Sequence, residues 1–226
     1  MVRSNYLYHE NMYSKFAQEG RMMWGDEEQL SADINRLTEL LSLKKFPPGS
    51  RALDLGCGTG EIVSWLEGNG YDSVGIDISK TAINIARERY SSLAARFYSL
   101  DISVADTLIL APFDVVVDNW FLHCIVGSDR DKVLNCISRS MSRYGVLLGS
   151  CMCNKVHGRT FEKSFDVKTR NLMDGDVAMR HIGTEKTLLA EFEAAGFSLI
   201  YSVVKSLQPG EPGADEFHYV LMNGAG

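Results

Sequence analysis

The 226-residue sequence contains no long hydrophobic run and no recognisable export signal. A membrane-spanning helix needs about 20 consecutive apolar residues, and no stretch of this chain approaches that length. The opening residues, Met1 to Tyr6, lack the apolar stretch of a secretory signal peptide. We therefore expect a cytoplasmic protein with no membrane partner.

Cysteines are few, and their spacing does not match a metal site. The sequence has five, and no two form a Cys-x-x-Cys pair. Cys151 and Cys153 have only His157 nearby and no second pair, so we expect no metal. They are more typical of small apolar residues just past a buried strand. An odd number of cysteines without an export signal also argues against disulfides.

An excess of positive charge is missing as well. The net charge is −6 and the isoelectric point is about 5.4. Strong nucleic-acid binders usually present a basic surface, so nucleic acid is an unlikely partner, although a local basic patch would still permit one. Apolar residues make up 45% and charged residues 23%, as in ordinary globular proteins. The length suits one α/β domain over residues 1–226, as a monomer or homodimer.

Three glycines stand close together in the stretch around which the chain is organised. Leu53 to Glu61 reads Leu-Asp-Leu-Gly-Cys-Gly-Thr-Gly-Glu, after an apolar run that begins at Ala52. An amphipathic segment, Ile62 to Leu66, follows at once, so the pattern predicts strand, turn and helix. Glycine lets the backbone bend sharply and lets a ligand approach closely. Open α/β sheets bind nucleotides at such a turn, at the carboxyl end of a strand.

Further acids follow the next expected strands. The apolar run Val74 to Ile78 contains Asp77, roughly 20 residues after the glycine turn, where a ribose-binding carboxylate is expected. Asp101 follows a third apolar run, and Asp118 ends the run that starts at Asp114. One carboxylate offers two acceptor oxygens, so Asp77 could accept both hydroxyls of a ribose.

These motifs, taken in order, resemble those of the class I methyltransferases that use S-adenosylmethionine (SAM). The resemblance runs from about Arg51 to about Gly149, with a looser similarity to the end. It implies a seven-stranded mixed sheet of order 3-2-1-4-5-7-6 with the last strand antiparallel. It also implies SAM as cofactor, S-adenosylhomocysteine (SAH) as product, and a small-molecule acceptor. A weaker resemblance to thiopurine and tellurite methyltransferases lies in the aromatic-bearing segment Gly20 to Asp26.

The periodicity predicts the other elements and a division of the chain into parts. We expect a helical cap over 1–46, a SAM-binding core over 50–150, a substrate-side insertion over 151–180, and a C-terminal helix and hairpin over 181–226. The expected helices are in 1–20 and at 31–43, 80–90, 129–144 and 185–195. The expected strands are 52–55, 74–78, 95–100, 115–118, 146–149, 177–182, 197–204 and 217–222. Two closing strands joined by a loop fit the methyltransferase fold and not the standard nicotinamide-binding fold.

The resemblance assigns cofactor contacts residue by residue. Gly56, Cys57 and Gly58 would hold the carboxylate of SAM through backbone amides at a helix N-terminus. The remaining assignments are Asp54 to the loop or the ammonium group, Asp77 to the ribose, Ile78, Asp101 and Ile102 to the adenine, and Asp118 to the loop below the sulfonium. Trp24 would close over the cofactor by a cation–π contact, or else would only pack the N-terminal helix.

The loop after Asp118 is the expected place of chemistry. It reads Asn119-Trp120-Phe121-Leu122-His123-Cys124 and lacks the Pro-Pro that follows Asn or Asp in DNA and protein-glutamine methyltransferases. His123 is the candidate general base, because its ordinary pKa lies near neutrality; alternatively it binds the backbone beneath the cofactor. Four residues of the late insertion are further candidates, for an anionic substrate: His157, Arg159, Arg180 and His181.

Three other functions remain open from the sequence. The chain could methylate a peptide or RNA, it could be a nicotinamide-dependent oxidoreductase with the same glycine turn, or it could hold SAM without catalysis. The acceptor atom is also open, because nitrogen, oxygen, sulfur and heavier chalcogens all accept methyl groups.

Overall fold

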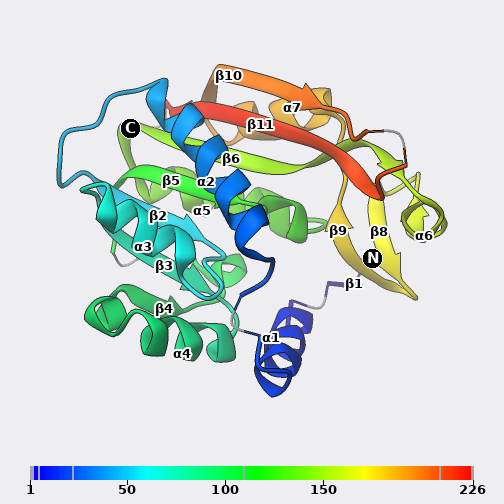
Figure 1. Ribbon diagram of the computed structural model, residues 1–226. Helices are drawn as coiled ribbons and strands as arrows, with labels where there is room; N and C mark the ends of the chain where they lie inside the picture. The colour runs from blue at the N-terminus through cyan, green and yellow to red at the C-terminus, as the bar shows by residue number, and fades with distance from the viewer. Residues whose placement is uncertain (1–2, 5, 22, 109, 209, 225–226) are drawn as a thin grey trace.

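Seven strands form the central sheet of the computed structural model, in the order β10-β11-β6-β5-β2-β3-β4 (Figure 1). The structure describes residues 3–4, 6–21, 23–108, 110–208 and 210–224, so Met22 of the aromatic-bearing segment and Pro209 of the last loop lie outside it. The sheet strands are β2 Arg51–Leu55, β3 Asp72–Asp77, β4 Phe97–Ser99, β5 Phe113–Asn119, β6 Met141–His157, β10 Phe197–Lys205 and β11 Gly213–Asn223.

The helices and a smaller sheet surround these strands. The α-helices are α1 Tyr8–Gln18, α2 Glu27–Ser42, α3 Glu61–Gly68, α4 Lys80–Arg89, α5 Asp129–Arg139, α6 Arg159–Ser164 and α7 Glu185–Ala194. Short 3₁₀ turns are η1 Ser91–Arg96, η2 Ile102–Val104 and η3 Leu122–Cys124. The smaller sheet has the order β1-β9-β8-β7, from Arg3–Ser4, Val177–His181, Asn171–Asp174 and Phe165–Asp166.

The strand order confirms the class I methyltransferase fold. From β4 to β10 the seven strands occupy the positions 3-2-1-4-5-7-6, when they are numbered along the chain within this sheet. β2 pairs in parallel with β3 and β5, and β6 is parallel to β5. β11 is antiparallel to both of its neighbours, β6 and β10. The predicted hairpin at the sheet edge is therefore present.

The central strands of the sheet are buried on both faces, as their continuous apolar runs predict, whereas the edge strand β10 is mostly exposed. Residues that alternate along the strands contact different helices. On one face Leu53, Val116 and Leu147 belong to a core cluster that includes α5 and α7 residues. On the other face Val117 and Leu148 pack with residues of α2 and α3. In the central strands, this double cover leaves the strand ends as the accessible part.

Two sequence expectations for the segment after β5 are wrong. The helix expected to Tyr144 ends at Arg139, and the strand expected over 146–149 is β6, which begins at Met141. The reason is that the backbone after the helix is taken by tertiary partners. The Ser140 carbonyl accepts from Phe113 N at 2.9 Å, and Asn223 Nδ2 donates to the carbonyls of Ser138 and Met141.

The segment 151–180 is more regular than its weak periodicity suggests. It contains the second half of β6, then α6, β7 and β8, and most of β9. Cys151 and Cys153 lie within β6, paired with β11, rather than past the strand, and both are buried free thiols. Among the described residues, no helix combines the length and the apolar character that crossing a membrane requires.

Gly149 provides a test of how tightly β5 and β6 are joined. Its φ is +156°, and a Cβ at this position would overlap the backbone carbonyl of Asp118 on β5. We expect Gly149→Ala to lower the free energy of unfolding by at least ~3 kcal/mol, since backbone cannot move aside cheaply. Gly175→Ala is the control: its φ is +56° with nothing near the added Cβ, so about 1–2 kcal/mol is expected. Equal losses in urea unfolding would contradict this account.

Candidate active site

A cavity of about 1170 Å³ opens at the carboxyl ends of the parallel strands. In Figure 1 this end of the sheet lies beside α1 and the smaller sheet. The cavity lining includes these sequence-predicted residues: Trp24, Asp54, Gly56, Cys57, Gly58, Asp77, Ile78, Asp101, Ile102 and His123. Residues separated by up to 99 positions in the sequence are thus brought to one site by the parallel topology.

The glycine turn between β2 and α3 leaves no room for a side chain at Gly56 or Gly58. Gly56 has φ +65° and Gly58 has φ +51°, which L-residues rarely adopt. A Cβ on Gly56 would come within 2.7 Å of the Phe121 ring, and one on Gly58 within 2.5 Å of Tyr13 Oη. The turn is therefore enclosed by the loop after β5 on one side and by α1 on the other.

Asp77 links the glycine turn to the end of β3. Its Oδ2 accepts from Gly58 N at 3.0 Å and its Oδ1 accepts from Ser79 N at 2.8 Å. Burial raises the pKa of Asp77 to about 6, although these two bonds act in the opposite direction. Each carboxylate oxygen has about two acceptor positions, so one position per oxygen remains for a ligand.

Asp54 is the least compensated acid in the site. It is buried at the end of β2, and no described residue donates a hydrogen bond to its Oδ2. Burial, followed by the charges of Glu61, Asp77 and Asp118, raises the pKa of Asp54 well above its usual value. A buried acceptor without a donor costs about 1–3 kcal/mol, so this position favours a bound cation or donor.

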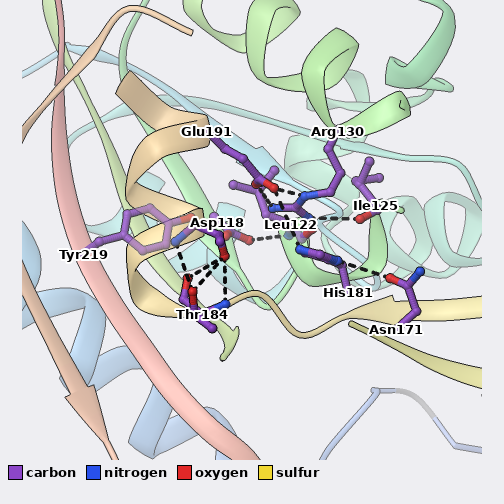
Figure 2. Close-up of polar contacts among 10 residues, drawn as sticks. Asp118, Leu122, Ile125, Arg130, Asn171, His181, Thr184, Glu191 and Tyr219 are labelled. Carbon is purple, nitrogen blue, oxygen red and sulfur yellow. Dashed lines mark hydrogen bonds and ion pairs between the residues drawn. The ribbon is translucent and has the colours of Figure 1, made fainter. Parts of the chain in front are cut away.

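Asp118 is not brought into the cavity, which corrects its assignment to the cofactor. Its Oδ1 accepts from Phe121 N at 2.7 Å and from Leu122 N at 3.0 Å, and its Oδ2 accepts from the Tyr219 hydroxyl. Figure 2 shows this carboxylate among partners of the protein itself. Burial raises the pKa of Asp118 to about 6. Its role is to fix the loop that leads to His123.

Asp101 combines a local bond with access to the cavity. Its Oδ1 accepts from Ser103 N at 2.9 Å and from Ser103 Oγ at 2.7 Å, and it thereby caps η2. Although this carboxylate caps η2, Asp101 still lines the cavity together with Ile78 and Ile102. An acid between two apolar side chains can accept a hydrogen bond from an amino group, while the apolar side chains pack against the flat ring that carries it.

Trp24 packs against helix α1 and also borders the cavity. Its ring centroid lies 5.4 Å from that of Phe16, 5.7 Å from that of Tyr13 and 6.1 Å from that of His9. The side chain is 42% exposed. The packing partner is thus the helix, and the open face of the indole is free to cover part of the cavity.

His123 lies in η3, buried, with no described partner for its Nδ1. Burial, followed by the charge of Arg180, lowers the pKa of His123 well below its usual value. The free protein therefore holds this imidazole neutral and weakly basic. The alternative, in which the ring binds backbone beneath the cofactor, is not supported by Nδ1, which makes no hydrogen bond to any described residue.

Sequence reasoning missed a network that anchors the loop after β5 to α2. Asp33 Oδ1 accepts from Arg36 NH1 at 2.7 Å and from Trp120 Nε1 at 3.1 Å. Arg36 also donates to Asn119 Oδ1, and its guanidinium lies 4.8 Å from the Trp120 ring centroid. Trp120 has φ +67°, a strained conformation that this network maintains.

Glu10 and Tyr13 of α1 were also missed. Glu10 accepts from the hydroxyls of Ser79 and Thr81, each at 2.6 Å, and so fastens α1 to the start of α4. Tyr13 is buried beside the glycine turn. Their only sequence signal was an aromatic pattern in a helix that precedes the core, which does not say where the helix docks.

Of the four candidates for an anionic substrate, only Arg180 lines the cavity. His157 bonds Asp215 at 2.8 Å, and His181 lies 3.2 Å from Asn171 Oδ1 (Figure 2). Arg159 is exposed on α6. Across the described chain, no cluster of three or more histidine, cysteine or acidic side chains could hold a metal ion.

Comparison with known proteins agrees with this geometry. Residues 53–147 match the family model described as a methyltransferase domain. The chain is 30% identical over 135 residues to the mRNA cap guanine-N(7) methyltransferase of Schizosaccharomyces pombe, in a match over 52% of this chain. That match spans 37% of the fission yeast enzyme, so the chain corresponds to well under two thirds of that relative.

Two solved structures of similar fold align over the whole chain. The [4+2]-cyclase SpnF has a TM-score of 0.72 with 17% identity, and the match covers 100% of this chain and 98% of that one. The 1,6-didemethyltoxoflavin-N1-methyltransferase of Burkholderia thailandensis, solved with SAH, has a TM-score of 0.69 with 19% identity, covering 100% and 92%. The sheet order is that of the class I methyltransferase fold, and residues 53–147 within it carry the match to a methyltransferase domain.

Proposed function

We propose that the chain transfers the methyl group of SAM to a small-molecule nucleophile. The observation that carries this proposal is the cavity, which joins the glycine turn and the acids of β2 and β3 to His123. Ligand pockets commonly measure about 300–1000 Å³, so about 1170 Å³ leaves space for a cofactor and a small acceptor together.

The residues of the cavity fit the three parts of SAM. The unpartnered Oδ2 of Asp54 would accept from the ammonium group, and the turn amides from Gly56 to Gly58 would donate to the carboxylate. Asp77 would accept from the ribose hydroxyls with the positions that Gly58 N and Ser79 N leave open. Asp101 and Ile102 would hold the adenine.

When bound, SAM supplies an electrophilic methyl carbon. Transfer to the acceptor's lone pair would leave the sulfur–methyl electron pair on sulfur and so yield SAH. The chain's contribution is to hold the acceptor in line and to exclude water, and positioning alone can remove several kcal/mol from such a barrier. Trp24 can cover one side of the site and the loop Asn119 to His123 another, since both line the cavity.

Several features favour a small acceptor over RNA or a peptide. The loop after Asn119 has Trp120 and Phe121 in place of Pro-Pro, and the chain carries a net charge of −6. The cavity is bordered on several sides by elements outside the strands, because α1, Trp24, β9 and β11 all contribute lining residues. These elements would thus enclose the acceptor, which suits a small molecule better than a macromolecule.

A labelled-methyl assay tests the proposal most directly. SAM carrying a labelled methyl group is incubated with the protein and with metabolite, peptide or RNA pools. We expect label in the metabolite pool only, and a Trp24→Ala variant should lose more turnover than stability, because its indole covers the site. Label confined to RNA or peptides would show that the acceptor is a macromolecule and not a small molecule. Binding of SAM without any transfer would indicate a non-catalytic protein.

The role of Asp77 gives a second prediction. Asp77→Ala should weaken SAH binding by about 1.5–3 kcal/mol, the scale of lost charge-assisted hydrogen bonds. Calorimetry on the folded variant measures this directly. Unchanged affinity would remove Asp77 from the site.

The pH dependence of binding follows from the same residue. With a pKa of about 6, the Asp77 carboxyl becomes protonated as the pH falls below that value and then offers fewer acceptor positions. SAH affinity should therefore be constant above about pH 7 and fall as the pH drops through about 6. The fall should be much smaller in Asp77→Ala, and a flat profile in the unmodified protein would contradict the assignment.

The glycine turn gives a further prediction. Gly58→Val should abolish measurable SAM binding, because its Cβ would contact Tyr13 Oη at 2.5 Å and its φ of +51° disfavours a β-branched residue. Gly70→Val is the control, with φ +86° but nothing near the added Cβ. Calorimetry should find SAM binding retained in the control and absent in Gly58→Val; tight binding by both would place the cofactor elsewhere.

A further inference from the structure

Arg180 is a cationic side chain of the cavity that the described protein leaves unpaired. It belongs to β9, lines the cavity, and its Nε is buried without a hydrogen-bond partner. Within the described residues its guanidinium donates no hydrogen bond and forms no ion pair. Arg180 is half-buried as a residue, but a guanidinium is always charged and has five donors, so burying even one N–H without an acceptor is unfavourable.

Two arginines are buried as whole residues in the described part of the chain, and both are paired. Arg130 donates to Glu191 Oε2 at 2.6 and 2.9 Å and to the carbonyls of Leu122 and Ile125 (Figure 2). Arg36 bonds Asp33 through its terminal nitrogen, although its Nε has no partner, like that of Arg180. The protein therefore supplies acceptors where an arginine has a structural role, and the lack of them at Arg180 calls for another explanation.

Two histidines near Arg180, His123 and His9, are uncharged, and one of them also has a ring nitrogen without a partner. His123 is buried with an unpartnered Nδ1, and it lines the same cavity as His9 of α1. Burial and then Arg180 lower the pKa of His9 to about 4, and the same two causes lower that of His123. This part of the cavity thus has one fixed positive charge beside two neutral imidazoles.

Acidic side chains do line the cavity, yet none forms an ion pair with Arg180 among the described contacts. Asp77 and Asp54 belong to the cofactor side, where the glycine turn lies. Glu216 bonds His218 at 2.8 Å, and Asp33 bonds Arg36. The positive charge of Arg180 is therefore open to a ligand.

We propose that Arg180 binds an anionic group, a carboxylate or a phosphate, of the methyl acceptor. This inference rests on the proposed methyl transfer, and it narrows the acceptor to a small anionic molecule. Arginine suits the task because its planar fork can donate two parallel hydrogen bonds to either anion. Of the cations in the late part of the chain that the sequence singled out, this is the one that the fold brings to the cavity.

Pairing of Arg180 would also change the chemistry of its neighbour. An anion beside the guanidinium offsets the positive field that helps to keep His123 neutral, so the imidazole becomes more basic. An acceptor with an O–H or N–H group could then pass its proton to the ring. The same anionic group would therefore both hold the acceptor and restore His123 as a base.

The test uses the protein saturated with SAH and observes its histidine signals by NMR. Benzoate, inorganic phosphate and neutral benzamide are titrated separately. We expect saturable shifts of the His123 and His9 signals with benzoate or phosphate and none with benzamide. Stronger binding of benzoate indicates a carboxylate acceptor, and stronger binding of phosphate indicates a phosphorylated one.

Variants assign the effect to Arg180. Arg180→Gln should weaken anion binding at least about tenfold, the low end for hydrogen bonds to a charged group, and Arg180→Lys should retain part of it. Arg159→Gln is the matched control, since that arginine is exposed on α6 outside the cavity.

Two results would overturn the inference: no saturable shift with either anion, or equal anion binding by Arg180→Gln. SAH calorimetry on each variant keeps the two proposals apart. Should the unmodified protein fail to bind SAH, the proposed function fails, while the anion titration of the free protein still reports on Arg180.

Discussion

Burial of three acids at the ends of adjacent parallel strands is the constraint on which the site depends. Asp77, Asp54 and Asp118 end β3, β2 and β5, which are neighbours in the sheet, and burial raises the pKa of each. The protein compensates them to different degrees. Asp118 receives three hydrogen bonds, Asp77 receives one on each oxygen, and Oδ2 of Asp54 receives none. The ligand site lies where the protein donates too few hydrogen bonds to these buried acids. A buried carboxylate without donors is stable only when a ligand supplies them.

The helices before the core complete this arrangement from outside. Glu10 fastens α1 to the start of α4, which brings Tyr13 to the glycine turn. Asp33 and Arg36 of α2 hold Asn119 and Trp120 beyond β5. The cavity walls are thus fixed by polar contacts between segments that are distant in the sequence, while the floor is built by the strands. Arg180 reaches the same space from the smaller sheet, so the acceptor side is assembled from parts that the core alone does not contain.

The strands could be predicted from short local patterns in the sequence, and the sheet order from the resemblance to the class I methyltransferases. The cofactor contacts stay predictions, although their residues line one cavity. An apolar run that ends in glycines or in an acid predicts a buried strand and the group at its carboxyl end. The same reasoning placed Asp118 in the site wrongly, since its position could not reveal that Tyr219, 101 residues later, would occupy its oxygen. It likewise extended a helix to Tyr144, because the bonds from Asn223 that end it are tertiary. Arg180 was one of four equal candidates until the fold separated them.

Proton release on SAH binding is the measurement that tests this account most directly. Burial raises the pKa of Asp77 to about 6, so this carboxyl is partly protonated near that pH, and burial also raises the pKa of Asp54 well above its usual value. A bound ammonium group and ribose hydroxyls favour the ionised carboxylates, so binding should expel protons. Calorimetry at about pH 6 in buffers of different ionisation enthalpy, chosen to match the pKa of about 6 at Asp77, measures the number released. Net release is the predicted result, and no exchange, or net uptake, would contradict the claim that SAM compensates these buried acids.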